Sequence, residues 1–149
     1  MNSHFNSIAL IGKPSSDISN TLCEIYRHLS DRKFNVVVDA ESRQHIDSQS
    51  VETSHIRDIG RHCDLAIAIG GDGTLLSAGR NLAPFNVPVV GVNLGRLGFL
   101  VDISPEDVVA RLDDILDGKF VSEERILLKA QLIRDEQVIH QQTAVNEVV

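Results

Sequence analysis

Cysteine, basic charge and long apolar runs are all scarce in this chain of 149 residues. Cys23 and Cys63 are too few for a disulfide framework or a thiol metal site, so we expect both to be buried free thiols. The formal net charge of −7 argues against nucleic-acid binding, which needs basic stripes that neutralise phosphates. A small-molecule ligand is the better expectation.

Signals for a membrane or an exported protein are also missing. Residues 1–6 lack a basic segment and a long apolar segment, and no later stretch approaches the length of a membrane span. The histidines lack the i, i+2 or i, i+4 spacing that would place two of them on one metal ion. We therefore expect a cytoplasmic protein with no membrane partner, and we assign no catalytic role to a histidine.

Apolar runs and helical patterns alternate between residues 7 and 118. The composition, with 42% hydrophobic and 23% charged residues, is that of a compact globular protein. The polar stretch 41–53 predicts a loop, followed by a short helix around residues 56–59. Strands are predicted at residues 7–11, 35–39, 65–69 and 87–92, and longer helices at residues 18–29, from Thr74 onwards, and from Pro105 behind an N-cap at Ser104. This alternation predicts the α/β class, with a doubly wound, Rossmann-like parallel sheet.

The pattern changes after Gly118. Residues 126–133, 138–142 and 143–149 read as successive strands, with a turn at residues 134–137 and no helix between them. We therefore expect an α/β domain over residues 1–120 and the first strands of a truncated antiparallel β domain over residues 121–149. Since the sequence stops inside a strand-like run, we expect the N-terminal part of a longer protein, whose exposed edges favour a homo-oligomer.

The five residues Gly70-Gly71-Asp72-Gly73-Thr74 directly follow the apolar run 65–69. Backbone N–H groups at a helix N-terminus attract anions, and glycines let a ligand approach the bare backbone. A carboxylate at such a phosphate site needs a reason, since it would repel the ligand. Asp72 could hold a divalent cation that bridges phosphates, or accept a proton from a hydroxyl that attacks a phosphoryl group. The alternative is that Asp72 only caps the helix.

Two better-known phosphate motifs do not fit. The turn after the first strand begins Gly12-Lys13 and lacks the further glycines of a dinucleotide-binding fingerprint, and the turn at Gly71 lacks the third glycine. The pair Gly118-Lys119 is followed by Phe120 and follows a helix, so it is not a P-loop. Hydride transfer and P-loop hydrolysis are both disfavoured.

Two further segments lie where a parallel sheet binds its ligand, beyond the C-terminal ends of strands. In the loop Asn93–Leu100, Leu97 and Phe99 could wall a flat ring, although Phe99 could equally belong to the core. Asn146 and Glu147 interrupt an apolar strand, so they could face the hydroxyls of a ribose, unless strand alternation simply points Glu147 to solvent.

These three segments together resemble the signature motifs of the NAD kinases, which use ATP to phosphorylate the 2′-hydroxyl on the adenosine ribose of NAD. The resemblance covers the whole chain but only about the first half of the family architecture, whose α/β domain is phosphofructokinase-like and whose second domain is a β-sandwich. It implies a kinase that makes NADP, with NAD and ATP as ligands and Mg²⁺ or another divalent cation as cofactor. Diacylglycerol kinases and phosphofructokinases resemble the glycine turn too, so a lipid or sugar kinase remains an alternative, as does a non-catalytic nucleotide-binding fragment.

The resemblance also implies roles for particular residues. Asp72 is implied to be the proton acceptor at the ribose hydroxyl, and Gly73 to contribute a backbone contact. The pocket residues implied in addition are Gly71, Thr74, Asn93, Leu97, Phe99, Asn146 and Glu147. The glycine turn is implied to face phosphates of NAD or of ATP, whereas the metal ligands are left open.

Overall fold

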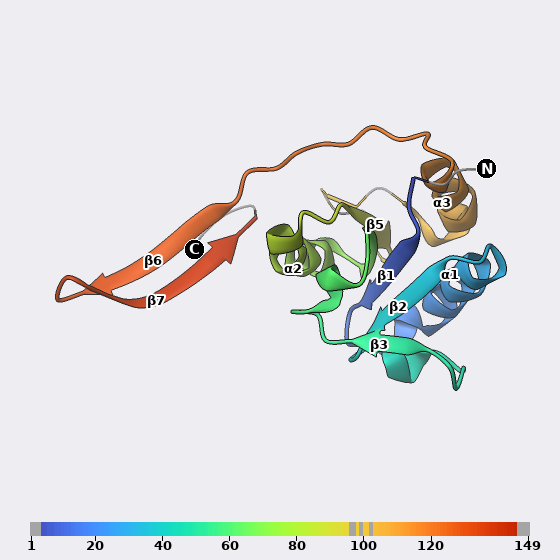
Figure 1. Ribbon diagram of the computed structural model, residues 1–149, viewed down its shortest axis with the longest axis horizontal. Coiled ribbons are helices and arrows are strands. Elements are labelled where there is room, and N and C mark those ends of the chain that lie inside the picture. The colour runs from blue at the N-terminus through green and yellow to red at the C-terminus, as the bar shows by residue number, and fades with distance from the viewer. Residues whose placement is uncertain (1–3, 96–97, 99, 102, 146–149) are drawn as a thin grey trace.

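Five parallel strands form the main sheet of the computed structural model, which describes residues 4–95, 98, 100–101 and 103–145 (Figure 1). The strand order across the sheet is β3-β2-β1-β4-β5. The strands are β1 (Ser7–Gly12), β2 (Asn35–Asp39), β3 (Glu52–Ser54), β4 (Leu65–Gly70) and β5 (Val89–Asn93). The predicted α/β class with a parallel sheet is confirmed.

Strand β1 lies at the centre of this sheet, and its neighbours come from two separate parts of the chain. Ile8 pairs in register with Val36 of β2 on one side and with Leu65 of β4 on the other. The sheet therefore grows in one direction from β1 to β3 and in the other from β4 to β5. This reversal is a topological switch point between β1 and β4, the place where open α/β sheets form their ligand crevice.

Helices cover both faces of the sheet. Helices α1 (Ser19–Asp31) and α3 (Val108–Leu116) pack on one face, where Ile8, Leu10 and Ile67 are buried with them. Helix α2 (Asp72–Leu82) packs on the other face, against small residues such as Ala66 and Ala68. Residues that pack against α1 and α3 alternate along each strand with residues that pack against α2, because successive side chains point to opposite faces of the sheet. Each fully buried leucine or isoleucine stabilises the fold by about 1.5–3 kcal/mol.

The segment between β2 and β4 contains structure that the sequence did not reveal. A 3₁₀ turn at Arg43–His45 and the strand β3 lie within the stretch predicted to be a loop, and the expected short helix is a 3₁₀ turn at Ile59–Arg61. Strand β3 pairs with β2 from Val37 to Asp39. Strand β3 lies at the edge of the sheet and consists of polar residues only. It therefore lacks the apolar pattern from which a strand is predicted.

Helix α3 begins behind a short 3₁₀ turn, Pro105–Asp107. Pro105 opens the turn as predicted, but the Ser104 hydroxyl donates a hydrogen bond to Asp107 Oδ2 at 3.2 Å and makes no side-chain cap bond to the backbone. The predicted N-cap position of Ser104 is therefore confirmed, and its side chain bonds to Asp107 instead of the backbone.

The chain after α3 ends in one antiparallel hairpin, β6 (Leu128–Arg134) and β7 (Gln137–Ala144). The predicted turn is confirmed, and its two central residues, Asp135 and Glu136, have the positive φ angles typical of a two-residue type I′ hairpin turn. The expected break between residues 142 and 143 is wrong, because β7 continues through it. The division into domains at residue 120 stays a prediction.

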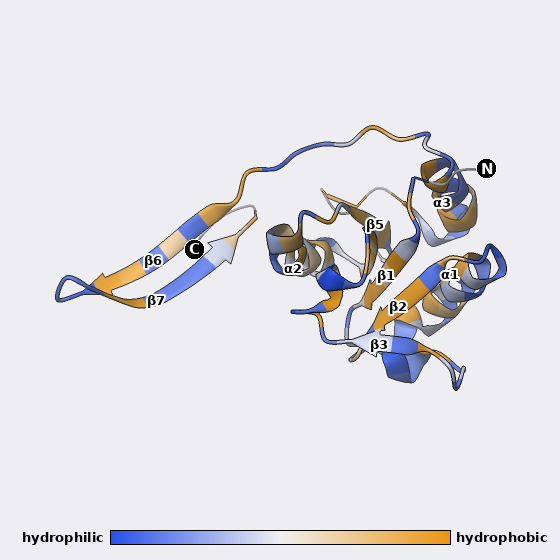
Figure 2. Cartoon of the chain, viewed as in Figure 1, coloured by the Kyte–Doolittle hydropathy of each residue, from blue (hydrophilic) through white to orange (hydrophobic). Residues whose placement is uncertain are grey.

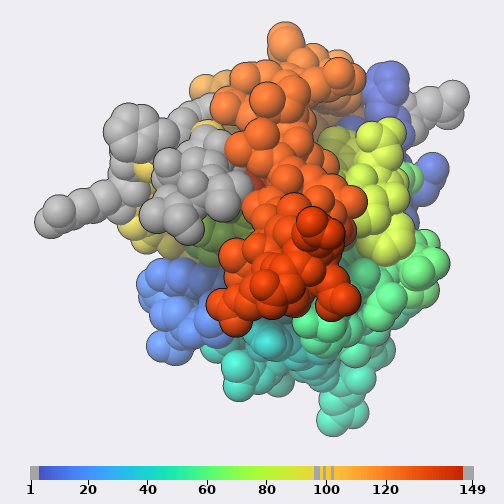
Figure 3. Space-filling view, turned by 90° about the vertical axis from the view of Figure 1, so that its left-hand side faces the viewer, coloured from blue at the N-terminus to red at the C-terminus, as the bar shows by residue number. Residues whose placement is uncertain are grey.

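The hairpin projects away from the sheet (Figure 1), and Figure 3 shows it from its far end, in front of the rest of the molecule. Both of its strands contain hydrophobic residues (Figure 2). Their side chains face solvent, with exposed fractions of 55% at Leu132, 60% at Ile133 and 52% at Val138. Its C-terminal end returns to the body, where Val145 Cγ2 lies 3.6 Å from the position that a Cβ on Gly79 of α2 would occupy. The hairpin thus presents apolar surface that this part of the chain leaves uncovered.

Both cysteines are partly buried and free of a disulfide. The Cys23 thiol donates to the carbonyl of His45 at 3.1 Å, and the Cys63 thiol donates to that of Ile59 at 3.4 Å. Burial, with the charge of Asp64 as a second cause, raises the pKa of the Cys63 thiol to about 11. Cys63 is therefore a poor nucleophile at neutral pH.

None of the helices in the part of the chain that the structure describes has the length and apolar character of a membrane span.

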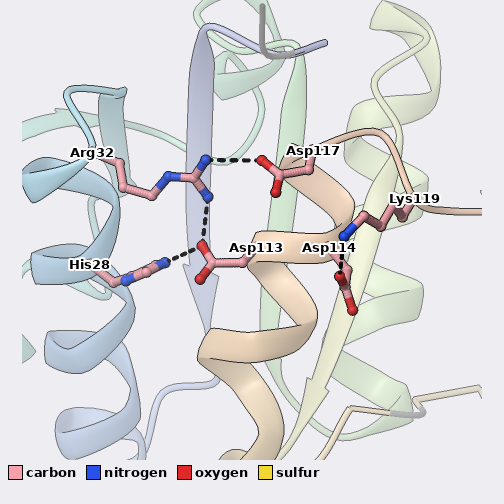
Figure 4. A network of polar contacts seen from close by, with 6 residues as sticks. All are labelled: His28, Arg32, Asp113, Asp114, Asp117 and Lys119. Atoms are coloured by element: carbon pink, nitrogen blue, oxygen red, sulfur yellow. Dashed lines mark hydrogen bonds and ion pairs between the residues drawn. The ribbon is translucent and has the colours of Figure 1, made fainter. Parts of the chain in front are cut away.

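A polar network joins α1 to α3 above the apolar contacts (Figure 4). The Asp113 carboxylate accepts from His28 Nε2 at 2.7 Å and from the Arg32 guanidinium at 2.5 Å, and the same guanidinium reaches Asp117 at 3.2 Å. Burial raises the pKa of Asp113, but the hydrogen bonds and charges of His28 and Arg32 outweigh it and hold that pKa below its usual value of 3.8.

Replacing Asp113 with asparagine is therefore expected to destabilise the fold in a pH-dependent way. The pKa is lower in the folded state, so the carboxylate stabilises the fold above its unfolded pKa, and this contribution disappears as pH falls below about 3.8. Because the Asp113 side chain is 42% exposed, screening limits the loss to about 0.5–1 kcal/mol. Urea unfolding of both proteins at several pH values checks this, and a difference that persists unchanged at pH 2 would contradict it.

Candidate functional site

The glycine turn lies at the C-terminal end of β4, beside the switch point. Strand β4 is buried along its whole length and ends at Gly70. Gly71 is the N-cap of α2, with φ −130° and ψ −164°, and its carbonyl accepts the N–H groups of Thr74 and Leu75. Helix α2 therefore begins at Asp72, two residues before the predicted start at Thr74. The turn places the N-terminus of this helix at the sheet edge where ligands bind.

The glycines of the turn occur there for different structural reasons. A Cβ on Gly70 would overlap the Thr74 side chain, with Thr74 Cβ only 2.9 Å away, so packing requires glycine there. At Gly71 and Gly73 a Cβ would meet no described atom within 4 Å. Packing within the described structure does not demand these two glycines, and their backbone is open to a ligand.

The loop that follows β5 lies directly against this turn. Gly70 pairs in register with Asn93, and the Leu94 N–H donates to the Gly70 carbonyl at 2.9 Å. The Asn93 side chain is buried, and its Oδ1 accepts from the Gly95 N–H at 3.0 Å, which shapes the start of the loop. The structure therefore brings together two of the three segments singled out in the sequence.

The Asp72 side chain joins the turn to this loop. Its Oδ1 accepts a hydrogen bond from the Leu100 N–H at 3.1 Å. A Cβ on Gly98 would lie 2.7 Å from Asp72 Cγ and 2.8 Å from Oδ2, so only glycine leaves room for the carboxylate. Asp72 is partly buried between the two segments, at the C-terminal edge of the sheet. This arrangement suits a group that must be held in one orientation.

A small cavity adjoins the loop on its other side. Asn93, Ser104 and Glu106 are among the residues that line it, and its volume is about 200 Å³. Pockets for drug-sized ligands and cofactors usually measure about 300–1,000 Å³. The cavity beside the loop lies below that range.

Four predicted site residues lie outside the described residues: Leu97, Phe99, Asn146 and Glu147. Their immediate described neighbours are nevertheless placed. Gly98 and Leu100 contact Asp72, and Val145 packs on α2 at Gly79. The described neighbours of both segments thus contact α2, the helix that Asp72 begins.

Three neighbours of the glycine turn were missed in the sequence. Gly98 and the Leu100 N–H act through the backbone, and only the spacing of glycines in the loop hinted at them. Lys13 follows β1, and its N–H donates to the Ile69 carbonyl at 3.0 Å. The pair Gly12-Lys13 at the end of a strand is a signal for it, once β1 is known to neighbour β4.

Comparisons with known proteins agree on one family. The model of the ATP-NAD kinase N-terminal domain matches residues 8–120. NAD kinases from Salmonella typhimurium and Salmonella typhi are 39% identical over 150 residues, which cover 100% of this chain and 51% of theirs. The chain thus spans about half the length of the curated relatives it matches.

Two solved structures share the fold. The crystal structure of yeast NADH kinase complexed with NADH has a TM-score of 0.78 at 22% identity, covering 97% of this chain and 47% of that one. An NAD kinase from Archaeoglobus fulgidus in complex with ATP has a TM-score of 0.58 at 21% identity, covering 83% of this chain and 42% of that one.

Proposed function

Because this chain belongs to the NAD kinase family, we propose that its full-length protein transfers the γ-phosphoryl group of ATP to the adenosine ribose 2′-hydroxyl of NAD, making NADP. The observation that carries the proposal is the Asp72 carboxylate, which the Leu100 N–H holds at 3.1 Å beside an open glycine turn. A helix N-terminus attracts phosphates, so a negatively charged carboxylate beside them is unfavourable on its own. Its presence is explained if it accepts a proton during the reaction.

In this proposal Asp72 is the proton acceptor. A bond forms between the ribose 2′ oxygen and the γ-phosphorus, while the bond from that phosphorus to the β–γ bridging oxygen breaks. ADP leaves, and the hydroxyl proton passes to the Asp72 carboxylate. Since phosphoryl transfer proceeds through a loose transition state, the nucleophile loses its proton late, and Asp72 acts in part by aligning the hydroxyl.

The remaining residues bind and position the substrates. The exposed backbone at Gly71 and Gly73 would approach phosphate oxygens, and Thr74, whose side chain folds over Gly70, would fix the first turn of α2. Asn93 would hold the start of the loop through its bond to Gly95. The family resemblance assigns Leu97 and Phe99 to the pocket wall, and Asn146 and Glu147 to NAD.

A divalent cation fits this site only as a companion of the nucleotide. Among the residues that the structure places, no group of three or more histidine, cysteine, aspartate or glutamate side chains could hold a metal ion. Mg²⁺ commonly binds through one or two carboxylates together with substrate phosphates and water. Asp72 could supply one such carboxylate, and the ion would supply positive charge to the transferred group.

The yeast and archaeal relatives are named for complexes with NADH and with ATP, which supports a dinucleotide and a nucleoside triphosphate as the ligands here. We extend the proposal to a cytoplasmic homo-oligomer, since the exposed apolar side chains of the hairpin, such as Ile133 and Val138, favour association.

Production of NADP is the direct test. The full-length protein is incubated with ATP, Mg²⁺ and NAD, and NADP is measured with an NADP-specific dehydrogenase. We expect NADP that depends on both ATP and Mg²⁺. Diacylglycerol and fructose 6-phosphate serve as alternative acceptors, and their phosphorylation without NADP formation would favour the lipid or sugar kinase. Nucleotide binding in calorimetry without any product would favour a non-catalytic module.

A further inference from the structure

Lys13 follows β1 and lies next to the glycine turn that contains Asp72. Strand β1 ends at Gly12 and pairs there with Ile69 of β4, so Lys13 lies alongside Gly70 at the beginning of the glycine turn. Its N–H continues the ladder by donating to Ile69 at 3.0 Å. The Lys13 Cβ is 3.3 Å from the position of a Cβ on Gly70, so its side chain starts directly beside the turn.

The ammonium group of Lys13 forms an ion pair with Asp17 that another anion could replace. Lys13 Nζ lies 2.7 Å from Asp17 Oδ2, four residues further along the chain, and the two side chains are 35% and 54% exposed. Ion pairs of this kind between exposed side chains contribute little stability, because water and salt screen them. A phosphate at the neighbouring turn would therefore compete well with Asp17.

The charge at the turn makes a nearby cation necessary. The residues Gly70 to Thr74 contain one carboxylate and no basic side chain, and the whole chain carries a formal charge of −7. A nucleotide phosphate bound there would be repelled by Asp72 unless positive charge offsets it. Lysine suits this role, since it is a compact charge on a flexible stem that can swing from one anion to another.

We propose that Lys13 leaves Asp17 and binds a phosphate of the nucleotide at the glycine turn, holding it in place against the Asp72 charge. This inference rests on the proposed nucleotide site, but not on turnover. The phosphate belongs either to the triphosphate of ATP or to the pyrophosphate of NAD, and separate titrations distinguish the two.

Calorimetric titration of the full-length protein with ATP and, separately, with NAD tests the role of Lys13. Lys13→Met removes the charge and keeps the stem, so we expect the Kd of one of the two nucleotides to rise about tenfold. Lys13→Arg should restore most of the affinity. Asp17→Asn is the matched control, since it breaks the same ion pair but keeps the cation, and we expect a Kd within about twofold of wild type.

Salt provides a second readout that a merely structural role would not change. The difference between wild type and Lys13→Met should shrink at high salt, because screening weakens the charge contact. The inference is overturned if Lys13→Met binds both nucleotides as tightly as wild type, if Asp17→Asn weakens binding equally, or if wild type binds neither. A protein that makes no NADP, yet loses nucleotide affinity in Lys13→Met, would refute the kinase proposal and keep this one.

Discussion

Replacing Asp72 with asparagine is expected to lower the turnover of the full-length protein by about 10²-fold or more, while the affinity for NAD changes modestly. Asparagine has nearly the same shape, and its side-chain oxygen can still accept the hydrogen bond from the Leu100 N–H that holds Asp72 at 3.1 Å. It cannot accept the proton of the ribose hydroxyl. The loss should therefore appear in kcat, measured by steady-state NADP formation with both substrates saturating.

The matched control is Asp113→Asn, which makes the same chemical change on α3, within the network that joins α3 to α1. Its kcat should stay within about twofold of wild type, because surface pairs of this kind affect stability only slightly. Thermal unfolding of both variants shows that the fold is retained. Near-normal turnover in Asp72→Asn would refute the role of Asp72 as proton acceptor.

Replacing Gly98 with alanine is expected to lower kcat/KM by about 10²-fold, although residue 98 supplies no chemical group. The new Cβ would lie 2.7 Å from Asp72 Cγ, which is far inside the contact distance of two carbon atoms. Either the carboxylate or the loop must move, and a displacement of about 1 Å at a reacting group is enough for a loss of this size. Steady-state kinetics of NADP formation measure it.

Gly95→Ala is the control for this substitution. Gly95 belongs to the same loop, but a Cβ there would meet no described atom within 4 Å, so we expect kcat/KM within about threefold of wild type. A second comparison is the double variant Gly98→Ala with Asp72→Asn. If Gly98 acts by leaving room for Asp72, the double variant should be little worse than Asp72→Asn alone. Full additivity of the two losses would contradict this explanation.

Much of the fold follows from local sequence patterns. The buried strands β1, β2, β4 and β5 are short apolar runs, and the α/β alternation predicts a parallel sheet because strands of that kind need helices between them. Strand β3 was not predicted because an edge strand of three polar residues has no apolar face that would indicate a strand. The predicted break after residue 142 was wrong because β7 is one continuous strand from Gln137 to Ala144.

The candidate site likewise combines features that local sequence patterns predict with features that depend on the tertiary structure. The position of Asp72 just after β4 could be predicted from the glycines that follow a buried apolar run, whereas its role stays a prediction. The hydrogen bond from the Leu100 N–H to Asp72 could not be predicted, since it joins residues 28 positions apart in the sequence. Lys13 and Gly70 are 57 residues apart in the sequence, and only the strand order brings them together. Contacts that arise from strand order are invisible to local periodicity.

A crystal structure of the full-length protein with NAD bound tests the central claim most directly. We expect the 2′-hydroxyl of the adenosine ribose to lie about 2.6–3.2 Å from an oxygen of Asp72, which is the distance at which a proton can be transferred. A structure in which the Asp72 carboxylate contacts only its own chain, while the ribose binds elsewhere, would contradict the account.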